Sequence, residues 1–91
     1  MANNNNSVWT ACELIAVLNL YYFLQATHQS MTASNPMIIN TANSIGRTVD
    51  AIVMRLQNYR FWETDGQEGL SNGGPRAEAF WKNNRWNHIV I

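Results

Sequence analysis

The stretch that decides the fold is NPMIINTANSIGRTVDAIVMRLQNY, residues 35–59. Asn35 followed by Pro36 is typical of a helix start, because Asn caps free backbone N–H groups and Pro suits the first helical position. Gly46 indicates the end of that helix. Thr48 is a second helix cap, and the apolar residues after it recur at helical spacing: Val49, Ile52, Val53, Leu56 and Tyr59. The stretch therefore predicts two helices, over residues 36–45 and 49–60, joined by a short turn.

A further helix is expected before this pair. Thr10 and Glu13 have the spacing of a capping box, which predicts a helix that starts at residue 11. Apolar residues cover most of its circumference up to residue 24, so we expect it at the centre of the domain. Residues 25–34 are polar and lose the helical period, which indicates a loop.

The second half of the chain contains a loop and a fourth helix. Four glycines lie between residues 63 and 74, which excludes a regular element there, and Pro75 predicts a helix through about residue 84. Residues 1–7 include four consecutive Asn and are expected to be a disordered leader. The prediction is an all-α fold, a compact bundle of about four helices, with a single domain over residues 8–91.

The charge distribution is uneven although the net charge is zero. All six Lys and Arg residues lie after residue 46, and the only charged residue before that point is Glu13. From Arg47 to Trp62, three arginines stand against Asp50, a local excess of two positive charges. Any electrostatic attraction to nucleic acid is therefore expected to be local and modest.

The remaining composition restricts the compartment. Cys12 is the single cysteine, which excludes an intrachain disulfide and suits the reducing cytoplasm. The apolar run of residues 8–24 is interrupted by Glu13 and Asn19, and the preceding leader has no Lys or Arg. Neither a membrane span nor a signal peptide is predicted.

The central helix pair has the spacing of a DNA-binding helix-turn-helix. Gly46 provides the turn, Ala42 is small enough for close crossing, and Ile52 is apolar at the position that enters the shared core. Such a unit directs the start of its second helix at base edges. The residues expected to project outward are Arg47, Thr48, Asp50, Ala51, Met54, Arg55 and Asn58. An ordinary helical hairpin would show the same spacing.

Two other segments are candidate DNA contacts. Asn72, Gly73 and Gly74 bring backbone amides to the start of the fourth helix, where Arg76 adds a charge, a combination that suits an anion. A plain connecting turn is the alternative. His28, in the loop before residue 35, is a weaker candidate contact.

The pattern as a whole resembles a known family. The segments are WTACELIAVLNLYYFL (9–24), SNPMIINTANSIGRTVDAIVMRLQNYRF (34–61), EGLSNGG (68–74) and AFW (79–81). They are similar to the DNA sulfur-binding domain family, the helical domain found ahead of the HNH nuclease in bacterial modification-dependent restriction endonucleases. The resemblance implies recognition of double-stranded DNA that carries a phosphorothioate, in which sulfur replaces a non-bridging phosphate oxygen.

The resemblance also implies a sulfur pocket. Sulfur is softer and less hydrated than oxygen, so an apolar pocket beside a basic group discriminates against ordinary phosphate. We expect this pocket at Val49, with Ala51 and the methyl of Thr48, beside Arg47. Val49 stands where that family commonly has Pro, and residues 25–34 lack the basic residue that similar domains carry there.

Two other functions stay open at this point. One is a helix-turn-helix DNA binder without preference for the modification, and the other is a helical protein-interaction adaptor. No motif of an enzyme, a metal site or a cofactor site is present, so no catalysis and no cofactor are predicted for this chain. Cleavage would come from an HNH nuclease domain or partner protein.

Overall fold

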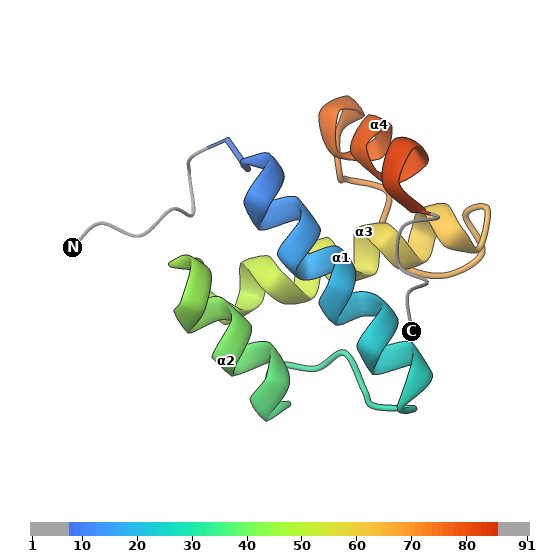
Figure 1. Ribbon diagram of the computed structural model, residues 1–91. Helices are drawn as coiled ribbons and strands as arrows, with labels where there is room; N and C mark the ends of the chain where they lie inside the picture. Colours follow the sequence, from blue (N-terminus) through green and yellow to red (C-terminus); the bar gives the residue numbers. More distant parts are fainter. Residues whose placement is uncertain (1–7, 86–91) are drawn as a thin grey trace.

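The computed structural model describes residues 8–85, which form four α-helices and, within that range, no strand. The helices are α1 (Ala11–Ala26), α2 (Pro36–Ile45), α3 (Val49–Glu63) and α4 (Pro75–Asn84) (Figure 1). The predicted all-α fold of about four helices is confirmed. The predicted leader over residues 1–7 lies outside the described residues. None of the helices between residues 8 and 85 combines the length and apolar character needed to cross a membrane.

The predicted caps set the helix starts. The Thr10 backbone N–H donates to Glu13 Oε1 at 2.9 Å, and the Glu13 N–H donates to Thr10 Oγ1 at 3.2 Å, which completes the capping box of α1. The side chains of Asn35 and Thr48 accept backbone N–H groups at the starts of α2 and α3. Each of these three starts was predictable because a cap acts within one turn of helix.

Two helix ends lie beyond the predicted positions. The first helix continues to Ala26 instead of ending near residue 24, and α3 continues to Glu63 instead of Arg60. The extra turn of α3 includes Trp62, which is half-buried and packs against the core. Packing of this side chain supports helix beyond the apolar period that the sequence shows.

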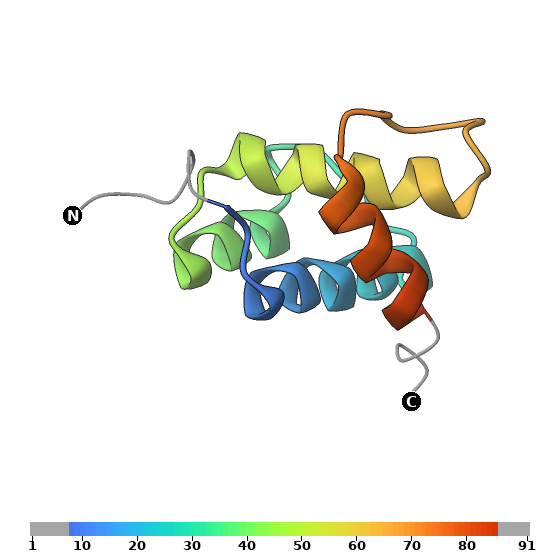
Figure 2. The ribbon, with the colours of Figure 1, turned by 90° about the horizontal axis from the view of Figure 1, so that it is seen from above.

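The four helices enclose one hydrophobic core. Figure 1 shows α1 crossing in front of α3, with α2 on one side and α4 on the other, and Figure 2 shows α1 and α3 as separate layers. Every helix contributes fully or almost fully buried side chains to this core: Val17, Leu18, Tyr21, Leu24, Ile38, Ala42, Ile52, Leu56, Tyr59 and Trp81. The buried Trp81 ring stacks on Tyr59 at 5.6 Å between centroids, and most of the other aromatic side chains also pack in or against the core.

The turn between α2 and α3 has the predicted shape. Gly46 adopts a left-handed conformation with φ 73°, and Ala42 and Ile52 are both buried between the helices. Burial of Ala42 and Ile52 agrees with their predicted places in the core, and the helix-turn-helix itself stays a prediction. That the pair reads DNA stays a prediction.

The loop between α3 and α4 runs back along α3. The Leu70 N–H donates to the Gln57 carbonyl at 3.0 Å, and Gly69 lies so close that an added Cβ would stand 2.2 Å from that carbonyl oxygen. Figure 2 shows the loop returning over α3 before α4 begins. As a result, the start of α4 lies beside the middle of α3, and the two segments can form one surface.

Candidate nucleic-acid interface

Two hollows lie side by side on this surface, and both are lined by Trp9 and Arg55. The first, called the α3 hollow here, has a volume of about 340 Å³ and is also lined by Thr48, Asp50, Ala51, Met54, Asn58 and Asn72. The second, the α4 hollow, has a volume of about 250 Å³ and is also lined by Val8, Leu14, Gly73, Gly74, Pro75, Arg76 and Ala77. Eight predicted contact residues therefore line one hollow or the other: Thr48, Ala51, Arg55, Asn58, Asn72, Gly73, Gly74 and Arg76.

Arg47 does not face outward as predicted. Its side chain is fully buried, with its Nη2 2.7 Å from Glu13 Oε1 and 3.3 Å from the Val8 carbonyl. Its guanidinium lies 4.4 Å from the centre of the Trp9 ring. The expected role of Arg47 as an exposed phosphate contact is wrong in this structure, because Glu13 neutralises the charge inside the domain.

Glu13 therefore has two structural roles. It caps α1 through Thr10 and it pairs with Arg47. Burial by itself raises the pKa of Glu13. The hydrogen bond and positive charge of Arg47, together with the hydrogen bonds of Thr10, outweigh this and lower the pKa below its ordinary value. The Glu13 carboxylate is thus kept in its charged form, where it accepts hydrogen bonds from Thr10 and Arg47.

Arg55 is the cation shared by the two hollows. Its guanidinium lies 4.6 Å from the Trp9 ring centre, and its Nη1 donates to Asn58 Oδ1 and to the Gly73 carbonyl, each at 3.2 Å. No carboxylate within residues 8–85 pairs with it, and its buried Nε has no hydrogen-bond partner there. Burial lowers the pKa of Arg55, and the nearby Arg47 cation lowers it further. An anion placed beside Arg55 would favour its charged form and so raise this pKa again.

Asn58 organises the loop and does not project outward as predicted. Only 2% of it is exposed, and its Nδ2 donates to the Leu70 carbonyl at 3.0 Å and to Asn72 Oδ1 at 2.9 Å. Both amide hydrogens of Asn58 are thus used within the protein. Asn72 in turn directs its own Nδ2 at Met54 Sδ, 3.6 Å away. The predicted exposure of Asn58 is therefore wrong, and Asn72 is the exposed member of this network.

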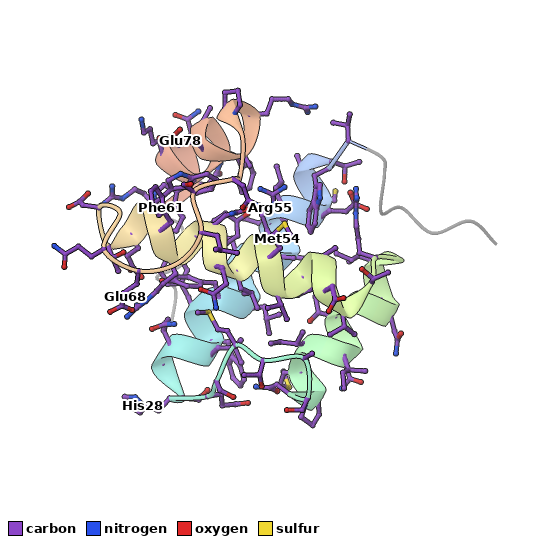
Figure 3. All side chains as sticks on the ribbon, turned by 180° about the vertical axis from the view of Figure 1, so that it is seen from behind. His28, Met54, Arg55, Phe61, Glu68 and Glu78 are labelled. Atoms are coloured by element: carbon purple, nitrogen blue, oxygen red, sulfur yellow. The ribbon has the colours of Figure 1, made fainter. Side chains whose placement is uncertain are left out.

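Two other predicted contacts lie apart from this group. His28 follows the far end of α1, about 24 Å along the helix from Trp9. Figure 3 shows it at the edge of the molecule, away from Met54 and Arg55 on α3. Val49 is half-buried and packs against the core, and it is not among the residues that line the α3 hollow. The structure therefore does not bring His28 or Val49 to the hollows, and a sulfur pocket walled by Val49 beside Arg47 has no support.

Sequence reasoning missed two members of the site. Trp9 is not among the predicted contact residues, although its ring contacts both Arg47 and Arg55. Glu13 was assigned only to the capping box. A signal for its second role was present, because a lone acid in the first 46 residues that falls within an apolar helix requires a partner.

Comparison with known proteins finds no matching family model, no matching curated protein and no matching solved structure. Membership of the DNA sulfur-binding domain family therefore stays a prediction.

Proposed function

We propose that this chain binds double-stranded DNA through the surface formed by the two hollows, and that it prefers a backbone carrying a phosphorothioate. The observation that supports this most directly is the composition of the α3 hollow. The Trp9 ring and the side chains of Ala51 and Met54 supply apolar wall, and Arg55 and the Asn72 amide supply hydrogen-bond donors.

This arrangement suits sulfur better than oxygen. A phosphate oxygen that enters the hollow gives up strong hydration and finds a partly apolar wall in exchange. A sulfur atom loses less hydration, and it packs well against polarisable groups such as the Met54 thioether and an aromatic ring. Asp50 also lines the hollow, but both kinds of diester carry one negative charge, so its carboxylate opposes both and leaves the preference to hydration and packing. Discrimination would then follow from the penalty on ordinary phosphate.

The start of α3 contributes to the same surface. Thr48, the N-cap of α3, is exposed and lines the hollow, and the helix dipole favours an anion at this end. In this reading the chain is a reader without catalytic activity of its own. It works in the cytoplasm, and an HNH nuclease domain or partner protein cuts the DNA to which it binds.

The direct test compares two duplexes of one sequence, with and without a single phosphorothioate, by fluorescence anisotropy at one salt concentration. We expect the wild-type protein to bind the phosphorothioate duplex at least tenfold more tightly, which corresponds to about 1.4 kcal/mol. Ala51→Asp, which adds a hydrated charge to the α3 hollow, should abolish this preference.

Ala33→Asp is the matched control, because Ala33 is exposed in the loop before α2 and the charge change is identical. It should keep the wild-type ratio of affinities. Equal binding of both duplexes by the wild-type protein would leave a DNA binder without preference for the modification. Binding to neither duplex would remove the proposal and leave the protein-interaction adaptor.

Asp50 provides a second prediction. Because its carboxylate lines the α3 hollow, Asp50→Asn should raise the affinity for both duplexes about fivefold at low salt, the effect of one repulsion of about 1 kcal/mol at close range in water. The gain should shrink as salt rises. The same anisotropy titration, repeated over a salt series, measures this change, and an unchanged affinity at low salt would place the DNA backbone away from the α3 hollow.

A further inference from the structure

The α4 hollow differs from the α3 hollow in its charges. Arg55 lines it from α3 and Arg76 lines it from the first turn of α4, so two cations from separate elements border one space. Neither arginine has a carboxylate partner among the residues that the structure describes. The acids of α1 and α4 are paired with other cations: Glu13 pairs with Arg47, and Glu78 lies 3.4 Å from Lys82. Within residues 8–85, neither positive charge is therefore compensated by an ion pair.

The position of Arg55 is fixed before any ligand arrives. Its guanidinium stacks on Trp9, and its Nη1 holds the Gly73 carbonyl, which leaves Nη2 without a hydrogen-bond partner in the described residues. The side chains of Val8, Leu14 and Ala77, which also line the hollow, are apolar and cannot accept a hydrogen bond from Arg55. Because Arg55 is already ordered in the free protein, binding of an anion costs little further side-chain conformational entropy.

The backbone at the start of α4 adds to the positive electrostatic potential of the α4 hollow. Gly74 is the N-cap of α4, and no side chain caps this helix. Gly74 also has open space around it, since an added Cβ would meet no atom within 4 Å. The amide dipoles of this ten-residue helix thus end at an accessible face of the hollow.

We infer that the α4 hollow binds an unmodified phosphodiester group of the DNA backbone, held between Arg55 and Arg76, next to the modified group in the α3 hollow. This inference rests on the proposed function. It assigns different tasks to the two hollows: the α4 hollow supplies affinity for any duplex, and the α3 hollow supplies the preference for sulfur. Both hollows lie at a helix start, but the α4 hollow offers two cations to a hard phosphate oxygen, whereas the α3 hollow offers one cation and the carboxylate of Asp50.

The test uses Arg76→Gln with Lys82→Gln as its matched control. Both changes remove one positive charge from α4, but Lys82 is exposed and does not line the α4 hollow. Arg76→Gln should weaken binding of both duplexes by about tenfold and flatten the slope of log affinity against log salt by about one unit, with the affinity ratio unchanged. Lys82→Gln should change the affinity for either duplex by less than twofold and leave the salt slope unchanged. Equal effects of the two variants would overturn the inference, and a lowered ratio in Arg76→Gln would assign the sulfur to the α4 hollow instead.

A second measurement separates this inference from the proposed function. Dimethyl phosphate, a singly charged phosphodiester without bases, is titrated into the ¹⁵N-labelled protein at millimolar concentration. The backbone amide signals of Gly74, Arg76 and Ala77 should shift in the wild-type protein and stay in place in Arg76→Gln. If no duplex binds but these signals shift, the hollow is a phosphodiester site and the DNA proposal fails. If these signals do not shift, the inference fails whatever the duplexes do.

Discussion

Glu13→Ala should lower the free energy of unfolding by about 3 kcal/mol or more, a large share of the stability of a domain of this size. The Arg47 side chain is fully buried, and Glu13 Oε1 lies 2.7 Å from its Nη2. Removing the carboxylate leaves a buried cation without its counter-charge and also removes half of the capping box. Urea denaturation followed by circular dichroism measures the loss.

Glu13→Gln gives the matched control for the charge. Gln keeps the length of the side chain and can still accept the Thr10 N–H at the start of α1. Its loss of stability should therefore be smaller than that of Glu13→Ala, but it should still exceed about 1 kcal/mol, because a neutral amide does not compensate Arg47. Arg47→Met combined with Glu13→Ala should recover part of the stability, since neither charge then stays buried alone. Additive losses in the double variant would contradict a coupled ion pair.

The same pair makes stability depend on pH. The folded-state pKa of Glu13 lies below its ordinary value of 4.5, so the charged form is favoured by folding. The stabilisation is therefore fully present above about pH 4.5 and is lost as the pH falls through the folded-state pKa. In Glu13→Gln this part of the acid destabilisation should be absent, which a comparison of urea midpoints for the two proteins at descending pH would measure.

Local signals account for the part of the fold that was predictable. The starts of α1, α2 and α3 follow from Thr10, Asn35 and Thr48, whose side chains bond to backbone groups within the next turn. Gly46 ends α2 because its left-handed conformation suits glycine. Helix ends were less predictable where packing decides them, as at Trp62.

The site was predictable only in part because it depends on contacts between distant segments. Glu13 and Arg47 are 34 residues apart, and Trp9 meets Arg55 across a larger separation. Helical spacing places a side chain on a face of its own helix, but it does not tell whether another element covers that face. Arg47 and Asn58 were expected outside for this reason, and both are buried.

Gly69→Ala should be destabilising and should also disable binding. Gly69 has φ +87°, and an added Cβ would lie 2.2 Å from the Gln57 carbonyl oxygen and 2.6 Å from the Phe61 nitrogen. The left-handed conformation alone costs a residue other than glycine about 1–2 kcal/mol. The contacts are with the backbone of α3, which cannot move aside cheaply, so the loop itself must shift, at a further cost of about 1–3 kcal/mol. Thermal unfolding gives the total.

Gly66→Ala isolates the clash from the conformational cost. Gly66 has nearly the same φ, +86°, but its added Cβ would only touch the end of the Phe61 ring at 3.4 Å. It should cost about 1–2 kcal/mol, by conformation alone, and leave DNA affinity unchanged. Gly69→Ala should, at a temperature where it is still folded, bind the phosphorothioate duplex at least tenfold more weakly, because a shifted loop moves Asn72 and Gly73 away from Arg55. Equal stability and equal affinity of the two variants would mean that the loop is not fixed on α3 and that neither hollow is formed in advance of binding.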